Sequence, residues 1–393
     1  MAGHANILGT DERPLFFAVA DGAARLSPPP ARLGLPVRFA ARSLSVMQKE
    51  GLAASSGGSV WRLVSDEGAY LDGFDVAPCP LAFLTVGMVS SYMSELLALA
   101  EQRGIVLRDV VLIQDNYYTM RGSALKGTMT GGAKDVQLEA RIASDAGEEA
   151  LQALVCDAVA ASPLGGLLRG VKDSLFTLTH NGRALTPAKA TPVTGEAAPD
   201  PVSLFDGLQP GETPEPIVRR GGMSPKTEEA TSSQGSSLAE EQDRTLHARG
   251  ICTVRPDGVK QIEQQLFNPH GSVFHFLSDE SGRAPDAASY VAAGIGFCFM
   301  TQPGRYAKIA RKDLSGYRVV QDIHFSRGGA TGGTGRAGAA DPVETHVFLD
   351  SAEDEDFART ALDIGEQTCF LHALCRTDLK ARVRVVAGEA AGG

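Results

Sequence analysis

Six cysteines are the side chains in this sequence most able to carry out chemistry, and they stand at positions 79, 156, 252, 298, 369 and 375. Their spacing forms no regular disulfide framework in a chain of 393 residues, which is typical of a protein in a reducing compartment. We therefore expect a cytoplasmic protein with free thiols. Individual thiols would then act as chemical groups rather than as structural cross-links.

The densest group of reactive side chains is a C-x-x-H-x-x-C run formed by Cys369, His372 and Cys375. On a helix, Cys369 and His372 would share a face, whereas Cys375 would point well away from them. A closed zinc site needs about four ligands, and no second ligand pair accompanies this run, so we expect no metal site. His372 is instead a candidate base or hydrogen-bond donor beside Cys369.

Composition and the remaining motifs exclude several functions. Lys and Arg number 37 against 47 Asp and Glu, a net charge of −10, and nucleic-acid binding needs a basic surface, so we expect no nucleic-acid partner. The longest uncharged stretch, 76–94, contains two prolines and three serines, so it predicts a buried helix and not a membrane span. The run GTGRAG at 333–338 matches a dinucleotide motif by letters alone, because a strand follows it where that motif needs a helix. We expect no cofactor.

The elements that must position these groups follow one pattern that is repeated once along the chain. In each half a strand ends in Ser-Asp-Glu (65–67, 278–280), and a long uncharged helix follows (78–100, 285–310). A strand, a Gly-rich loop, another strand, a last helix (148–168, 353–374) and a final strand complete each half. Landmarks recur at a constant offset of 207 residues, as in Gly87 with Gly294 and Ser162 with Cys369. This constancy indicates an internal duplication.

We interpret the two halves as repeats at 1–186 and 244–393, joined by a flexible linker at 187–243. The linker contains eight of the 21 prolines and a Ser/Thr/Glu/Gly-rich run, so it buries too little apolar surface to offset its ordering entropy. The first long helix is apolar almost all round and must be enclosed on most sides. We predict an α+β fold in which each repeat is a mostly antiparallel sheet with a long buried helix, and the two repeats pack as an intramolecular pseudo-dimer.

This order of elements resembles the osmotically inducible protein C and organic hydroperoxide resistance family (OsmC/Ohr). The resemblance covers residues 30–185 and 245–390 and excludes the linker. In that family a reactive cysteine lies inside the long central helix in an Ala-Ala-Cys-Phe-like context, and a second cysteine lies near the start of the last helix. Residues 292–299, AAGIGFCF, are similar to the first site and contain Cys298. Residues 368–372, TCFLH, are similar to the second and contain Cys369.

The resemblance implies a cysteine-dependent reduction of organic hydroperoxides, with a small apolar substrate. A thiolate at Cys298 would cleave the O–O bond and become a sulfenic acid, which Cys369 would capture as a disulfide. An external dithiol reductant would then restore both thiols, and no cofactor is implied.

The resemblance also implies an arginine from an early strand, held by a glutamate near the helix start, because a reactive thiolate needs a nearby cation. Arg255 is the expected arginine, with Arg249, Arg38 and Arg42 as alternatives. Asp286 is the acid nearest to the position of the glutamate, where this chain has Ala288.

The first half carries Ser91 and Ser162 at the positions of the two cysteines. A serine without an identified base is a poor nucleophile, so we expect this half to act as scaffold and as one wall of a single pocket around Cys298. Two other functions stay open. One is a hydrolase in which Cys298 attacks a carbonyl substrate, with His324, His346 or His372 as base, and the other is a non-catalytic redox-sensing or binding module. Further oligomerisation also stays open.

Overall fold

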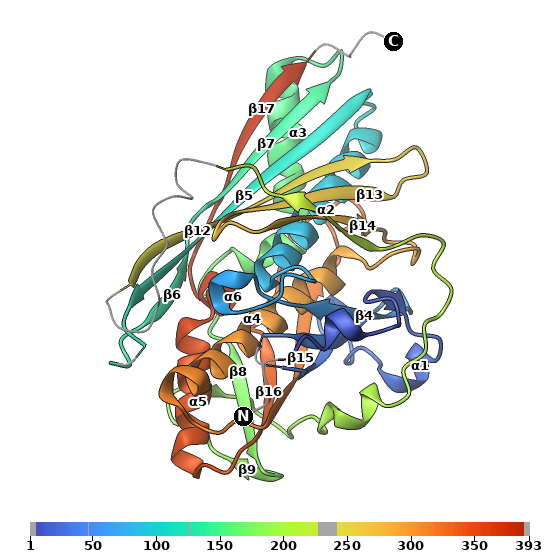
Figure 1. The fold of residues 1–393 in the computed structure, drawn as a ribbon. Helices are drawn as coiled ribbons and strands as arrows, with labels where there is room; N and C mark the ends of the chain where they lie inside the picture. The colour runs from blue at the N-terminus through green and yellow to red at the C-terminus, as the bar shows by residue number, and fades with distance from the viewer. Residues whose placement is uncertain (1–4, 46, 125, 227–241, 389–393) are drawn as a thin grey trace.

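The structure is a computed structural model, and it describes residues 5–45, 47–124, 126–226 and 242–388. Two sheets enclose two long helices, α2 (Pro80–Gln102) and α4 (Ala287–Ala310), which cross each other at the centre of the molecule (Figure 1). The mixed α and β class predicted from the sequence is therefore confirmed.

Sheet 1 has nine strands within the described residues. Its order is β1 (Phe17–Ala18), β4 (Val60–Ser65), β3 (Lys49–Ser55), β2 (Gly34–Ser43), β15 (Gly316–Ser326), β16 (Glu344–Asp350), β8 (Leu175–His180) and β10 (Thr191–Pro192), with β9 (Arg183–Leu185) beside β8. Its neighbouring strands pair antiparallel, except that β8 is parallel to both β16 and β10. A meander from the first half of the chain is thus extended by two strands from the second half.

Sheet 2 has the same arrangement with the halves exchanged, and the described residues contribute eight strands to it. Its order is β11 (Val218–Met223), β14 (Ser272–Ser278), β13 (Lys260–Asn268), β12 (Gln242–Val254), β5 (Asp109–Gly122), β7 (Val136–Ala143) and β17 (Ala381–Gly388), with β6 (Thr130–Ala133) beside β5. Here a meander from the second half is extended by three strands from the first, namely β5 and β7 with β6 beside β5.

The two halves are joined at the centre of each sheet by long antiparallel ladders. In sheet 1, β2 pairs with β15 from Gly34 opposite Ser326 to Arg42 opposite Arg318. In sheet 2, β5 pairs with β12 from Leu112 opposite Cys252 to Gly122 opposite Gln242. Neither half therefore completes a sheet by itself.

The two long helices are buried because apolar residues surround them. Helix α2 is long and apolar enough to cross a membrane, but 83% of its most apolar window is buried inside the protein, between sheet 2 and α4. The helices meet at Gly87 and Gly294, where an added Cβ would lie 2.6 Å from the Ala287 carbonyl oxygen and 2.8 Å from the Leu84 nitrogen, respectively. Glycine is needed at both positions for this close approach.

The described residues also form four shorter α-helices, which are α1 (Gly22–Arg25), α3 (Glu148–Ala161), α5 (Glu355–Thr368) and α6 (Phe370–Cys375). The sequence predicted one continuous last helix in each half. In the structure each of these helices stops early, at Ser162 and at Cys369, where the backbone is extended.

The segment expected to be a flexible linker differs from that expectation where it is described. Through Lys226 it contributes β10 to sheet 1 and β11 to sheet 2, and it places Phe205 and Leu208 against the outer face of sheet 1. These two side chains are 3% and 1% exposed, so this part of the segment buries apolar surface. Residues 227–241 of the segment lie outside the described residues.

Candidate functional site

Cys298 lies halfway along α4, on a helix face that it shares with Thr301, Gln302 and Arg305. These four side chains line one small cavity of about 40 Å³ together with residues of the first half. Cys298 itself is 2% exposed. All six cysteines lie in the described part of the chain, all are free thiols, and Cys298 is one of the five that are buried.

Cys369 lies at the break between α5 and α6, with φ −71° and ψ 119°. This extended residue ends one helix and begins the next, so its side chain faces the first backbone N–H groups of α6. The His372 N–H is directed at the Cys369 sulfur and favours its thiolate. The break therefore creates an anion-stabilising position that a continuous helix would lack.

The Cys298 and Cys369 thiols are neighbours, close enough for each to shift the pKa of the other. Burial raises the pKa of Cys298 well above its usual value, and its hydrogen bond to Cys369 raises it further. Burial also opposes ionisation of Cys369, but the hydrogen bond from Cys298 and the adjacent His372 imidazole together bring the pKa of Cys369 well below its usual value. The pair thus holds its proton on Cys298 and its negative charge on Cys369.

His372 is where the sequence placed it, beside Cys369. Its ring is fully buried and packs edge-on against Phe176 and Phe299, at centroid distances of 5.3 and 5.5 Å. Neither ring nitrogen makes a hydrogen bond of good geometry to another described residue. The imidazole is therefore held by packing, with its nitrogens available to the thiol pair.

The carboxylate that lines the cavity of Cys298 is Glu67, from the Ser-Asp-Glu turn of the first half, and it is 5% exposed. It accepts hydrogen bonds from Thr301 Oγ1 at 3.1 Å and from the Tyr70 hydroxyl at 2.8 Å. Burial raises its pKa, and attraction to the fully buried Lys49 opposes that rise. Burial correspondingly lowers the pKa of Lys49, whose ammonium donates to the Met47 carbonyl oxygen at 2.8 Å.

Arg305 provides the cation in the cavity that contains Cys298. Its side chain is largely buried, and its Nε has no hydrogen-bond partner among the described residues. Burial lowers its pKa, as does the neighbouring Arg244, while Glu67 opposes this. A buried Nε–H group without a partner at a cavity wall can donate a hydrogen bond to an anionic or polar ligand.

The structure does not bring Arg255 or Asp286 to the thiols. Arg255 forms ion pairs with Glu215 and Asp257 at the end of β12, and it does not line the cavity of Cys298. The alternatives Arg249, Arg38 and Arg42 also lie outside that cavity and pair with Asp115, Asp322 and Glu50. Each of these arginines has a close acidic neighbour on an adjacent strand or turn, which explains why it stays there.

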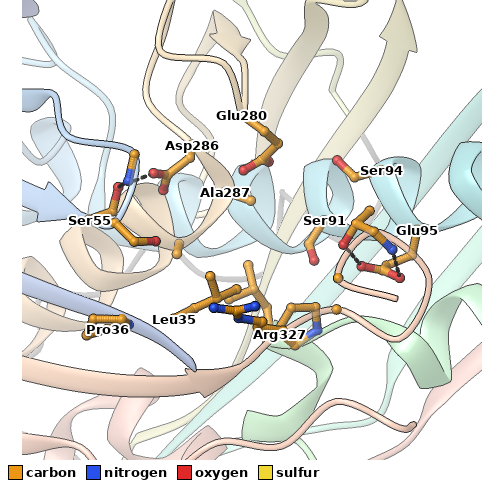
Figure 2. A pocket seen from close by; sticks show the side chains of 18 residues that line it. Leu35, Pro36, Ser55, Ser91, Ser94, Glu95, Glu280, Asp286, Ala287 and Arg327 are labelled. Carbon is orange, nitrogen blue, oxygen red and sulfur yellow. Dashed lines mark hydrogen bonds between the residues drawn. The ribbon is translucent and has the colours of Figure 1, made fainter. Parts of the chain in front are cut away.

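Asp286 caps the N-terminus of α4, accepting from the Ser289 N–H at 2.6 Å and from the Ser55 hydroxyl. It lines a second, larger cavity, of about 370 Å³, in which Ser91 takes the place of Cys298 (Figure 2). The Ser91 and Ser162 hydroxyls are hydrogen-bonded at 2.7 Å. Ser162 has φ −61° and ψ 124°, close to the conformation of Cys369, so the serine pair and the cysteine pair occupy matching positions.

Sequence reasoning missed Glu67, Lys49 and Arg305. Arg305 follows Cys298 by seven residues, the spacing of one helix face, so it was detectable. Glu67 and Lys49 belong to the other half of the chain, and no spacing rule connects them to Cys298. The repeated Ser-Asp-Glu turn was the available signal, and it was interpreted as the end of a strand.

Other candidate groups are placed away from the thiols. His324 and His346 lie on β15 and β16, and burial lowers the pKa of both. Neither of them lines the cavity of Cys298. Within the described residues, no group of three or more His, Cys, Asp or Glu side chains is arranged to hold a metal ion.

No protein-family model matches the sequence, and no curated protein matches it significantly. The chain is similar to the crystal structure of an OsmC-like hydroperoxide resistance protein from Jannaschia sp. CCS1, with 18% identity and a TM-score of 0.20 over 31% of this chain and 79% of that chain. A likeness at this TM-score carries no argument about activity, so the chemistry must be derived from the site itself.

Proposed function

We propose that this protein is a thiol-dependent hydroperoxide reductase that works through Cys298 and Cys369. The observation that carries the proposal is the contact between the two thiols, which have opposite pKa shifts and of which Cys298 faces a cavity. A buried thiol pair of this kind can form a disulfide without a large movement of the chain.

The chemistry begins at the thiol pair. The Cys369 thiolate accepts the proton of Cys298, and the Cys298 sulfur attacks a peroxide oxygen. The O–O bond breaks, Cys298 becomes a sulfenic acid, and the departing alkoxide takes the proton from Cys369 to leave as an alcohol. Arg305 faces the same cavity and stabilises the negative charge that develops on the departing oxygen.

The second step uses the restored Cys369 thiolate. It attacks the Cys298 sulfur, the S–O bond breaks, and hydroxide leaves and is protonated to water. The product is a Cys298–Cys369 disulfide, and an external dithiol reduces it by thiol–disulfide exchange. This cycle needs no metal or cofactor, and it suits a reducing compartment such as the cytoplasm.

The cavity restricts the substrate. Its volume of about 40 Å³ is close to that of one water molecule in the liquid, about 30 Å³. Its apolar walls include Leu81, Leu246, Leu266 and Phe370. A small peroxide group fits beside Cys298, while an attached apolar group requires these side chains to move outward.

We also infer that the chain is a pseudo-dimer of two repeats. Three observations support this inference: the matching strand orders of the two sheets, the paired glycines at the crossing of α2 and α4, and the matching serine and cysteine pairs. Glu67 of the first half meets Cys298 of the second half, so the thiol site requires both repeats.

Intact mass and thiol titration of the reduced full-length protein, after addition of tert-butyl or cumene hydroperoxide, test the activity. We expect two of the six thiols to disappear with a loss of about two mass units, and a dithiol to restore them. Cys298→Ser should keep all of its remaining thiols. Cys369→Ser should react more slowly, because Cys298 loses the base that accepts its proton, and should end as a sulfenic acid that dimedone traps. Ser91→Ala is the matched control and should oxidise as wild type does.

Three outcomes would contradict the proposal. An unchanged mass after exposure to every hydroperoxide would leave only a binding role for the site. A stable acyl adduct formed from an activated ester at Cys298 would indicate the hydrolase. A disulfide that forms only once, because no dithiol turns it over, would indicate a redox sensor.

A further inference from the structure

The cavity beside Ser91 is the counterpart of the thiol cavity, but it is much larger, at about 370 Å³ against about 40 Å³. This volume falls within the range of small-molecule sites, which begins near 300 Å³. Its inner end is formed by Ser91 on α2, whose hydroxyl is bonded to that of Ser162. No step of the thiol chemistry uses this cavity.

One wall of the cavity carries a guanidinium group without a partner. Arg327 begins the Gly-rich loop after β15, and its side chain makes no hydrogen bond or ion pair with any described residue. The loop is nevertheless anchored, because Glu95 of α2 accepts from the Ala330 N–H at 2.8 Å, from the Thr331 N–H at 3.2 Å and from the Thr331 hydroxyl. Arg327 is thus presented to the cavity by a fixed loop.

The opposite wall is acidic. Figure 2 shows Arg327 and Glu280 on opposite sides of the cavity, with Ser91 beside them. Glu280 is 49% exposed, and its ion-pair contact is a long one, 3.7 Å to Lys260. Asp286 is already occupied by Ser55 and by the N-terminus of α4. Glu280 is therefore the carboxylate best able to receive a ligand.

We propose that this cavity binds a small zwitterion of the amino-acid type, with its carboxylate on Arg327 and its ammonium group on Glu280. A guanidinium group holds a carboxylate through two parallel hydrogen bonds, and Arg327 has all its donors free. A simple anion would be repelled by Glu280 and Asp286, and a simple cation by Arg327. Leu35, Pro36 and Leu164 add apolar wall for a side chain.

The binding should depend on pH through Glu280. Solvent reaches the Glu280 side chain through the cavity, but the protein around the carboxylate partly desolvates it and raises its pKa to about 6. Repulsion from Asp286 and Asp279 acts in the same direction, and attraction to Lys260 and the hydrogen bond from the Ala287 N–H oppose it. The ammonium group of the ligand binds the ionised carboxylate. Affinity should therefore fall as the pH drops through about 6, while the carboxylate of the ligand stays ionised.

Calorimetric titration of the full-length protein with L-leucine and L-phenylalanine tests the proposal. Each is compared with its analogue without the ammonium group, 4-methylpentanoate or 3-phenylpropionate, and with its analogue without the carboxylate, 3-methylbutylamine or 2-phenylethylamine. We expect at least one amino acid to bind, and each of its analogues to bind about tenfold more weakly or worse, since a charge-assisted contact is lost.

Variants assign the two contacts. Arg327→Gln should lower the affinity for the amino acid to the affinity that wild type has for the amine analogue. Arg336→Gln, on the same loop but outside the cavity, should leave the affinity unchanged. Glu280→Gln should weaken binding at neutral pH and remove its pH dependence. Cys298→Ser should bind as wild type, which separates this site from the thiol chemistry.

Two results would overturn the assignment. One is the absence of heat for both amino acids up to about 10 mM, a limit that corresponds to a binding free energy weaker than about 3 kcal/mol. The other is an amino acid that binds Arg327→Gln or Glu280→Gln as well as it binds wild type.

Discussion

Gly294 lies where α4 crosses α2, and its replacement by alanine tests whether the molecule depends on that crossing. The new methyl group would lie 2.8 Å from the Leu84 nitrogen and 3.2 Å from the Pro80 carbonyl oxygen. Both are backbone atoms of α2, which cannot turn aside as the end of a side chain can. The two helices must therefore move apart.

Two effects of opposite sign set the size of the change. Alanine is favoured over glycine inside a helix by about 1 kcal/mol. Overpacking a close-packed core costs about 1–3 kcal/mol, and the rigid contacts place Gly294→Ala near the upper value. A displacement of about 0.5 Å also loses roughly a quarter of the dispersion attraction across the gap. We expect a net loss of about 1–2 kcal/mol in the free energy of unfolding.

Urea unfolding of wild type, Gly294→Ala and Gly87→Ala measures this change. Gly87→Ala is the matched variant, because its methyl group would lie 2.6 Å from the Ala287 carbonyl oxygen. The double variant should lose less than the sum of the single losses, since one displacement of the helices relieves both contacts. If Gly294→Ala is as stable as wild type or more stable, the gain in helix propensity is at least as large as the cost of overpacking. That result would refute the close crossing of the two helices.

Two further predictions follow from the electrostatics and from the sheets. Burial opposes ionisation of Asp279, but hydrogen bonds from Arg283 and Ser281 lower its pKa to about 2, below its usual value of 3.8. The stabilisation by its carboxylate is therefore present above about pH 4 and is lost as the pH falls through 2. Asp279→Asn should therefore lower the urea midpoint at pH 6 and have a much smaller effect near pH 2. An equal loss at both pH values would contradict this. The two halves, residues 1–226 and 242–393, should each be unfolded or self-associated when expressed separately, and they should fold together when mixed. The reason is that each sheet joins the two halves through its central ladder. A stable monomer of either half, observed by sedimentation, would contradict the pseudo-dimer.

Much of the secondary structure could be predicted, because periodicity and composition are local properties. The helix at 78–100 was expected to be buried on most sides, and α2 lies between sheet 2 and α4. The pairing of β2 with β15 could not be predicted in this way. A strand's side-chain pattern shows which face is buried, but it does not identify the neighbouring strand, since the ladder is made by backbone groups common to all residues.

The thiol pair shows the same division between local and long-range information. Resemblance indicated Cys298 and Cys369, and the structure places them side by side. Their charged surroundings were not predicted, because Glu67 and Lys49 come from the other half. The helix break at Cys369 was also missed, since residues 353–374 are compatible with one continuous helix. This break aligns the His372 N–H with the sulfur, so the omission concealed why Cys369 carries the negative charge.

The difference between the two cavities follows from the side chains at equivalent positions. In the thiol cavity, Leu81, Leu266 and Phe370 fill the space beside Cys298. The offset of 207 residues matches Leu81 with Ala288 and Phe370 with Pro163, and the strand registers match Leu266 with Ser55. These three residues line the cavity of Ser91, and each is smaller than its counterpart. Removal of this apolar volume opens the second cavity, and the same change exposes Asp286 and Glu280 to a ligand. Two identical chains would have to change both sites together. Within one chain, the site with large side chains can protect a reactive thiol pair from solvent while the site with small ones accommodates a polar molecule.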